Sequence, residues 1–353
     1  MAKRQKQATA EAADPYLVLG LNPRAEQVVF EAAHQALKRS LAARGDNQGL
    51  SQLETAWALI GDPDTRAEFD AEHRRHLDGK VVGGRYRIDK FIAEGATGET
   101  YQATYLIDGD GTCAKGDTVC LKHFSKIDPK LDSLLIQEFL TMRRVRHYAF
   151  PAAHELIRLD DGCLALVMSF IKGPTLEQAV EKVGALKPEA VCGIADRLLN
   201  SLMYLHHEGI VHGDLKPQNI ILQPKTHLVA LVDFGLAVVK PTSGSSSKGY
   251  TDDFAAPELV AENRPPLPES DLYGLGMVMT YALGGGMRAV KRKALPKGIP
   301  DPLRRFVKRL IVLDPLARPR WENENLCRQM EELRQECFGR IHTDMEGWLP
   351  EDE

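Results

Sequence analysis

The sequence predicts a two-lobed α+β fold, with a small β-rich lobe ahead of a larger helical lobe and an all-α module at the N-terminus. Apolar residues recur at helical spacing from residue 14 to about 77, with no strand pattern among them. Short β-rich runs separated by glycine follow between residues 80 and 170, and from residue 173 to 338 the pattern is mostly helical. Strands followed by helices indicate two lobes of one α+β domain.

The composition excludes several classes of function. The hydrophobic fraction of 43% and the charged fraction of 27% are those of a folded globular chain. The six cysteines include no CxxC pair, which argues against a zinc ribbon or a secreted disulfide scaffold and fits a cytoplasmic protein. A net charge of -4 gives no reason to expect nucleic-acid binding. The longest uncharged stretch, Leu272 to Met287, is too short and glycine-rich to span a membrane.

The N-terminal module is expected to consist of a tail and short helices. Residues 1–13 are small, polar and mildly basic, which predicts a flexible tail without a secretory signal. Asp14-Pro15 indicates a helix start, and Gly20 indicates its end. Turns rich in Gly, Asp and Pro separate the expected helices, which cover about residues 15–20, 28–41, 53–60 and 64–75.

The next part of the chain is expected to form a sheet around one helix. Alternating or β-branched runs separated by glycine predict its strands. The sequence Asp-Gly-Asp-Gly at 108–111 predicts a hairpin turn. The expected elements are strands at about 85–88, 100–105 and 118–122, a helix at about 131–145, and strands near 154–159 and 163–170.

The strongest chemical signal is the run His-Gly-Asp-Leu-Lys-Pro-Gln-Asn at residues 212–219. Phosphoryl transfer needs a carboxylate near the attacking hydroxyl, a cation at the transferred phosphate and an oxygen ligand for magnesium. Asp214, Lys216 and Asn219 supply these three groups within a short stretch. Asp233, in a downstream Asp-Phe-Gly run, offers the metal a second carboxylate.

Together with the run Ala-Pro-Glu at 256–258, these motifs resemble the catalytic domain of serine/threonine protein kinases. The resemblance implies ATP and Mg²⁺ as cofactors and a protein serine or threonine as acceptor. It also implies that Asp214 is the catalytic base, assisted by Lys216 and Thr251, and that Asn219 and Asp233 hold the metal. The resemblance covers residues 80–338, with an N-lobe at 80–170, a C-lobe at 173–338 and an acidic tail at 339–353.

The same resemblance implies an ATP site. Lys122 would position the phosphates, with Glu138 on the next helix as its ion-pair partner. Residues 93–101 resemble the glycine-rich loop, although Ala93 stands where the family has its first glycine. The adenine ring would lie between Cys120 and Ile221, against the hinge that joins the lobes. The expected ATP-site residues are Ala93, Gly95, Gly98, Thr100, Cys120, Lys122, Glu138, Met168, Ser169, Ile171 and Ile221.

Two other functions stay open at this point. A pseudokinase, or ATP-binding scaffold, would keep the fold without the chemistry, but such chains usually lack one of the motif residues, all of which are present here. A small-molecule phosphotransferase of similar fold often has the same His-Gly-Asp run. Those enzymes usually lack the equivalent of Lys216 and the Ala-Pro-Glu run, so Lys216, Glu258 and Arg318 favour a protein substrate.

The N-terminal module, residues 14–78, resembles the J-domain of DnaJ-type co-chaperones. The similarity lies in residues 16–21, 56–63 and 66–70. The His-Pro-Asp turn of that family is missing, because residues 41–45 read Leu-Ala-Ala-Arg-Gly. We therefore expect this module to bind a protein partner or to contact the kinase lobes, rather than to act as a co-chaperone. The alternative is a helical cap without a separate function.

Overall fold

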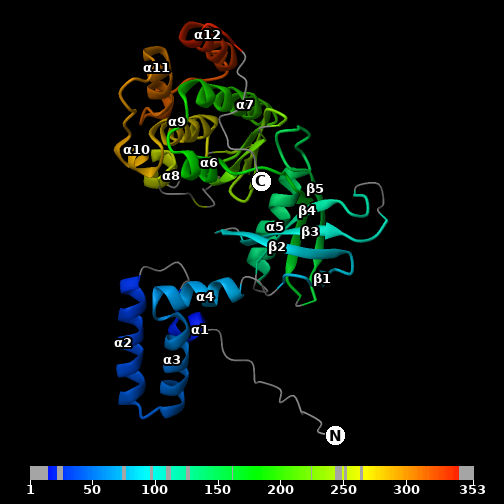
Figure 1. Cartoon of the computed structure of the whole chain (residues 1–353), viewed down its shortest axis with the longest axis vertical. Coiled ribbons are helices and arrows are strands. Elements are labelled where there is room, and N and C mark those ends of the chain that lie inside the picture. The colour runs from blue at the N-terminus through cyan, green and yellow to red at the C-terminus, as the bar shows by residue number, and fades with distance from the viewer. Residues whose placement is uncertain are drawn as a thin grey trace. The chain divides into compact units, whose positions relative to one another are not determined.

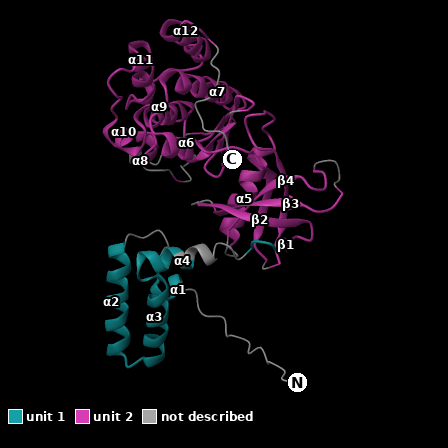
Figure 2. Cartoon of the chain, viewed as in Figure 1, with its two compact units in different colours: residues 1–80 teal, residues 81–353 magenta. Residues whose placement is uncertain are grey.

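The computed structural model separates the chain into two compact units, Met1–Lys80 and Val81–Glu353, which are described here one at a time (Figure 2). The structure describes residues 15–21, 27–73, 77–95, 98–108, 113–124, 128–160, 162–223, 225–242, 249, 253–262 and 265–341. The predicted tail at residues 1–13 and the predicted helix cap Asp14 lie outside these ranges.

The first unit contains the four predicted helices (Figure 1). They are α1 (Pro15–Leu19), α2 (Gln27–Ala43), α3 (Asn47–Ile60) and α4 (Pro63–His73). A short turn joins α2 to α3, where the Asp46 carboxylate accepts a hydrogen bond from the Gly49 nitrogen at 2.8 Å and caps α3. The buried side chains Phe30, Leu53 and Ile60 form the centre of a small core.

The second unit begins with a six-stranded antiparallel sheet in the order β1-β2-β3-β4-β6-β5. One helix, α5 (Pro129–Met142), lies against β5 and β6. It begins before the predicted position because Asp128 caps it and Pro129 fits the first turn. The strands are β1 (Val81–Val82), β2 (Tyr86–Gly95), β3 (Gly98–Tyr105), β4 (Thr118–His123), β5 (Ala153–Arg158) and β6 (Leu164–Ser169).

The larger lobe of this unit is mainly helical. Its helices are α6 (Leu176–Val183), α7 (Pro188–His207), α8 (Pro257–Glu262), α9 (Pro268–Gly284), α10 (Met287–Arg292), α11 (Asp301–Leu310) and α12 (Leu326–Phe338), with 3-10 turns at Pro217–Asn219 and Pro315–Ala317. Two short strand pairs carry the loops of the site: β7 (Ile210–Val211) with β10 (Val238–Val239), and β8 (Ile220–Gln223) with β9 (Leu228–Leu231).

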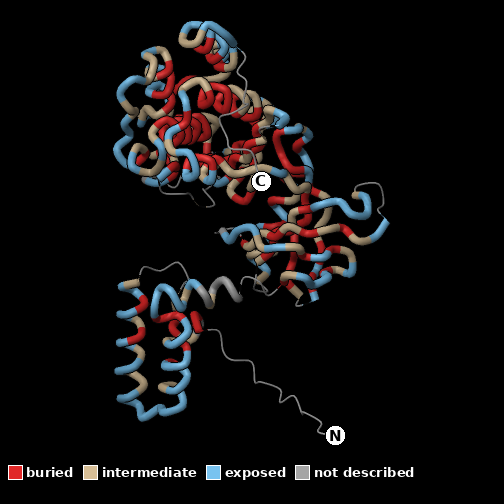
Figure 3. The backbone as a smooth tube through the Cα atoms, in the orientation of Figure 1, coloured by how far each residue is buried: buried red, intermediate tan, exposed pale blue. Residues whose placement is uncertain are grey.

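Helix α9 forms the centre of the larger lobe. Its residues from Ser270 to Leu283 are all buried, and α7, α10 and α11 lie against it (Figure 3). A helix that is apolar on every side is stable only inside a protein. This arrangement confirms the predicted α+β, two-lobed class. Among the described residues, we find no helix that is both long enough and apolar enough to cross a membrane.

Candidate active site

Lys122 on β4 is the meeting point of two carboxylates. Its Nζ atom lies 2.8 Å from both carboxylate oxygens of Glu138 on α5 and 2.8 Å from Oδ1 of Asp233. The side chains of Lys122 and Glu138 are only 5% and 2% exposed, whereas that of Asp233 is 25% exposed. The structure thus brings the predicted lysine–glutamate pair together and adds Asp233, the aspartate expected to bind the metal, to it.

Burial and charge act against each other at this cluster. Burial alone lowers the pKa of Lys122, but the charges of Asp233 and Glu138 reverse this effect and hold the pKa above its usual value. Burial alone raises the pKa of Asp233, and the ammonium of Lys122 more than compensates, so the pKa of this carboxyl lies well below its usual range. Both groups are therefore charged at neutral pH.

The glycine-rich loop is formed by the ends of β2 and β3. Ala93 faces Thr100, and Gly95 faces Gly98 across the hairpin, whose two tip residues lie outside the described ranges. Gly98 has a φ of 111°, and a Cβ atom there would come within 2.5 Å of the His123 carbonyl oxygen. Only glycine fits this close approach of two backbones.

The catalytic loop holds three predicted residues together. Nζ of Lys216 lies 2.6 Å from Oδ2 of Asp214. The Asn219 amide nitrogen donates to the Asp214 carbonyl oxygen at 2.9 Å and to Oδ2 at 3.0 Å. Both hydrogen bonds use the nitrogen of Asn219, which leaves its amide oxygen as the atom suited to a cation.

Asp233 adopts a backbone conformation that is rare for a residue other than glycine, with a φ of 68°. Its Oδ1 atom also accepts a hydrogen bond from the Gly235 nitrogen at 3.1 Å. The next residue, Phe234, is fully buried and makes edge-to-face contacts with Phe150 and His212 at centroid distances of 5.6 and 5.2 Å. This packing fixes the strained residue in place.

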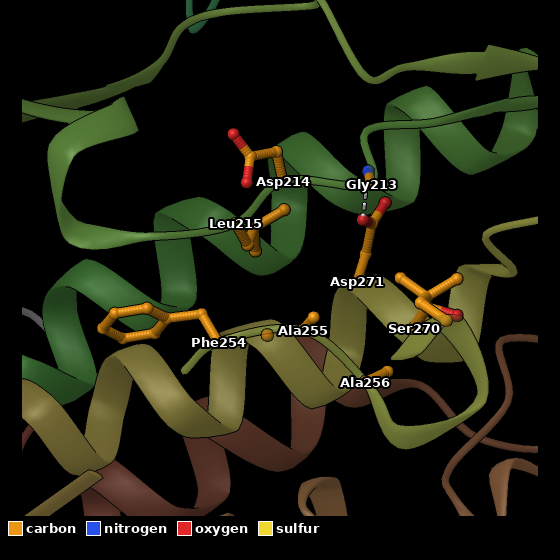
Figure 4. A pocket seen from close by; sticks show the side chains of 10 residues that line it. Gly213, Asp214, Leu215, Phe254, Ala255, Ala256, Ser270 and Asp271 are labelled. Carbon is orange, nitrogen blue, oxygen red and sulfur yellow. Dashed lines mark hydrogen bonds between the residues drawn. The ribbon is translucent and has the colours of Figure 1, made fainter. Parts of the chain in front are cut away.

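Asp271, at the start of α9, holds the backbone of the loop at 212–219 by hydrogen bonds. Its carboxylate accepts hydrogen bonds from the backbone nitrogens of His212 and Gly213, each at 2.8 Å. Figure 4 shows Asp271 reaching the nitrogen of Gly213, with the Asp214 carboxyl directed away from it. Gly213 has a φ of 76°, so glycine relieves backbone strain beside Asp214, the predicted catalytic base.

Asp271 has a third hydrogen-bond partner, His206, which the sequence did not predict. Nε2 of His206 lies 2.8 Å from Oδ2 of Asp271, and the indole nitrogen of Trp321 lies 2.7 Å from Nδ1 of the same ring. Because an indole nitrogen can only donate, Nδ1 of His206 must accept the hydrogen bond from Trp321. The ring proton therefore lies on Nε2, which donates a hydrogen bond to the Asp271 carboxylate. Trp321 therefore fixes the tautomer of a histidine that orients the loop.

A buried ion pair closes the larger lobe. The Arg318 guanidinium donates to both Glu258 oxygens at 2.6 and 2.8 Å, and both side chains are nearly inaccessible. Ser270 donates to the same carboxylate at 2.8 Å. Burial raises the pKa of Glu258, but these hydrogen bonds outweigh it and hold the pKa below its usual value. The pairing of Glu258 with Arg318 is thus confirmed, whereas Ser270 was not predicted.

The predicted adenine-binding residues lie at the junction of the two lobes. Cys120 pairs with Met168 across β4 and β6, and Ile221 lies on β8. The Ser169 nitrogen already donates to the Ala152 carbonyl oxygen at 2.9 Å. Ile171 follows in the connection to the larger lobe. Thr251 lies outside the described residues, so its expected role stays a prediction.

The donor set suits magnesium that enters with a nucleotide. No cluster of three or more His, Cys, Asp or Glu side chains able to hold a metal occurs in the described part of the chain. Mg²⁺ does not need one, because it usually takes one or two protein oxygens together with phosphates and water. Asp233 offers such an oxygen beside Lys122, and the Asn219 carbonyl oxygen accepts a hydrogen bond at 2.9 Å from the nitrogen of Val232, the residue before Asp233. The close backbone approach at Gly98 fits a phosphate-covering loop.

Comparison with known proteins agrees with this geometry. The protein kinase domain family matches residues 86–329. The chain is 30% identical over 272 residues to the serine/threonine-protein kinase PkaA of Streptomyces coelicolor, an alignment that covers 69% of this chain and 49% of PkaA. It is 27% identical over 263 residues to the serine/threonine-protein kinase PknA of Mycobacterium tuberculosis, covering 69% and 60% of the two chains. The chain therefore belongs to the protein kinase family, and it spans about half the length of PkaA.

Proposed function

We propose that this chain is a serine/threonine protein kinase that uses ATP and Mg²⁺. The observation that carries the proposal is a pair of lysine–aspartate contacts, Lys122 with Asp233 and Lys216 with Asp214. The two pairs are neighbours, because the charge of Lys216 also helps to lower the pKa of Asp233. These residues supply the groups that phosphoryl transfer needs: a carboxylate for the acceptor hydroxyl, cations for the phosphates and an oxygen ligand for the metal. The names of the two relatives support the same activity.

Positioning and electrostatics supply the catalysis in this proposal. Lys122, fixed by Glu138, holds the α- and β-phosphates of ATP. Asp214 orients the acceptor hydroxyl and takes its proton as the new O–P bond forms and the bond to the departing ADP breaks. The ammonium group of Lys216 neutralises negative charge that develops on the transferred phosphoryl group. Asp233 and Asn219 would hold Mg²⁺, which would neutralise charge on the phosphates.

The structure also bears on the two alternatives. Lys216 contacts Asp214 directly at 2.6 Å, so the lysine that small-molecule phosphotransferases usually lack has a partner in the site. The formed contacts of Lys122 with Glu138 and Asp233 argue against a pseudokinase, because that role needs no such charged cluster. We therefore place the protein kinase first.

The test is transfer of labelled phosphate from Mg-ATP to the full chain and to a generic basic protein. Asp214→Asn keeps the size of the side chain but removes the base, and we expect a loss of about 10²–10⁴-fold. Asp160→Asn, at an exposed turn of the same unit, is the matched control and should match the wild type. Equal labelling by Asp214→Asn would contradict the proposal. Transfer only to small hydroxylated acceptors would favour the second alternative.

We further propose that residues 14–78 are a J-like module that binds a protein partner in the cytoplasm. The support is the order of the four helices, with α2 and α3 joined by a turn that lacks His-Pro-Asp. That turn reads Arg-Gly-Asp at 44–46. The full chain should therefore leave the ATPase rate of an Hsp70-type chaperone unchanged, whereas a DnaJ-type protein raises it. Stimulation by this chain would contradict the proposal.

A further inference from the structure

A basic surface lies on the segment made of α10, the loop after it and α11. Residues 288–309 contain nine lysines and arginines and one acidic residue, although the whole chain has a net charge of -4. Both helices cover α9 with their apolar sides (Figure 3). Eight of these cations are exposed. The six exposed cations that form no ion pair or hydrogen bond within the described residues are here called the basic face: Arg288, Lys291, Arg292, Lys297, Arg305 and Lys308.

The members of the basic face differ from the other cations of the segment in their pairing. The other three cations of the segment have partners, since Lys293 donates to Tyr273 and both Arg304 and Arg309 pair with carboxylates. Within the described residues, no member of the basic face forms an ion pair. A segment with nine cations and one acidic residue favours an anionic partner at its surface.

The complementary charge lies in the same chain. Residues 342–353, outside the described ranges, contain five acidic residues and no lysine or arginine. They follow α12, which contacts α11. Extended, twelve residues reach up to about 40 Å.

The end of α12 lies beside the basic face. Burial raises the pKa of the Cys337 thiol, and the charge of Glu336 adds to this rise. Two groups act in the opposite direction, a hydrogen bond with the Leu303 backbone and the charge of Arg305. Both of these groups belong to α11. The acidic segment therefore starts a few residues from a cation of the basic face.

We propose that residues 342–353 bind the basic face of their own chain and cover it against other acidic segments. Single exposed ion pairs are weak, but tethering raises the effective concentration of the segment to the order of millimolar. A segment with a dissociation constant of about 1 mM as a free peptide would then cover the face about half of the time. This proposal does not depend on phosphoryl transfer.

The test is zero-length carbodiimide cross-linking of the full chain, read by peptide mass spectrometry. The reagent joins a carboxylate to a lysine only where the two are in contact. We expect links from residues 342–353 to Lys291, Lys297 and Lys308. Their yield should fall at least about fivefold in 1 M salt, because the screening length drops to about 3 Å.

The decisive variant is Arg288→Glu/Arg292→Glu/Arg305→Glu, which keeps all three reactive lysines but reverses the charge around them. We expect at least a fivefold loss of these links. The matched control reverses three exposed arginines elsewhere and should keep the wild-type yield: Arg39→Glu/Arg44→Glu/Arg143→Glu. If the first variant fails to fold, Asp344→Asn/Glu346→Gln gives the same test from the other side, with Glu351, Asp352 and Glu353 as reporters.

Three results would overturn the proposal. One is the absence of links between residues 342–353 and the lysines of the basic face. Another is an equal yield in the charge-reversed and control variants. The third comes from an equal mixture of ¹⁵N-labelled and unlabelled chains: if about half of the links join a labelled to an unlabelled peptide, the statistical share for binding between copies, the segment binds another chain instead.

Discussion

Two lysine–glutamate pairs of nearly equal length lie in very different surroundings. In the N-terminal unit, Lys38 lies 2.7 Å from Glu54, and the side chains are 55% and 47% exposed. In the kinase domain, Lys122 lies 2.8 Å from Glu138, and the side chains are 5% and 2% exposed. If the first pair breaks, water solvates both charges at little cost in free energy. The charges of the second pair are buried, so each needs a partner of opposite charge within the protein. Burial, rather than contact distance, therefore distinguishes the pair at the proposed site.

The same contrast holds for two tryptophan–histidine pairs. Trp57 stacks on His34 in the N-terminal unit, with ring centroids 4.2 Å apart. Trp321 instead donates a hydrogen bond to His206, which in turn contacts Asp271 under the catalytic loop. The first pair contributes packing to a small helical core. The second is connected through hydrogen bonds to the backbone of the catalytic loop.

The largest effect on stability should come from breaking the buried pair of the larger lobe. Glu258→Gln leaves Arg318 charged and buried without its counter-ion, which we expect to lower the free energy of unfolding by about 3–5 kcal/mol. Glu54→Gln removes one partner of the exposed pair and should leave the unfolding midpoint unchanged. Urea unfolding followed by circular dichroism measures both. Similar midpoints for the two variants would contradict the role given to burial.

A smaller effect is expected at the tryptophans. Trp321→Phe keeps an aromatic ring but removes the donor that fixes the His206 tautomer, so the catalytic loop loses part of its support. We expect kcat to fall about tenfold or less, with KM for ATP unchanged, because misplaced catalytic groups slow the chemical step. Trp57→Phe is the matched control and should leave kcat as it is. Equal kcat values for both variants would rule out a positioning role for Trp321.

The smallest effect concerns a thiol in the proposed ATP site. Burial raises the pKa of Cys120 to about 12, with Lys122 acting against this rise. Since the thiolate is the reactive form, iodoacetamide should hardly label Cys120 at pH 8, and the rate should rise about tenfold per pH unit as the pH approaches that pKa. Cys113, which has the same intermediate exposure as Cys120 but lies before β4, serves as an internal comparison and should be labelled first. Fast labelling of Cys120 at pH 8 would show that this site is more open than described.

Much of the fold could be predicted from the sequence because the signals are local. Helical spacing and Gly or Pro boundaries located all four helices of the first unit to within a few residues, apart from α3, which begins six residues earlier because Asp46 caps it. In the second unit, the family motifs identified Lys122, Glu138 and Asp233, which the structure brings within hydrogen-bond distance.

The remaining contacts could not be predicted in this way because they join distant positions without a shared motif. Trp321 and His206 are 115 residues apart, and nothing in their neighbourhoods indicates that an indole meets that imidazole. The hydrogen bond from Ser270 to Glu258 is a similar case. A serine at the start of a helix is usually explained by capping, which gives no reason to expect a bond to a distant carboxylate. Such partners become visible only once the lobe is packed around α9.

The most direct test of the account compares the two lysine–glutamate pairs by phosphoryl transfer. Lys122→Met and Lys38→Met each remove one ammonium group from a pair of nearly equal length, and labelled-phosphate transfer from Mg-ATP is measured beside wild type, with circular dichroism confirming that both fold. We predict a loss of about 10²-fold or more for Lys122→Met, because a buried charge that meets the phosphates is removed, and wild-type transfer for Lys38→Met. Wild-type transfer by a folded Lys122→Met variant would contradict the account.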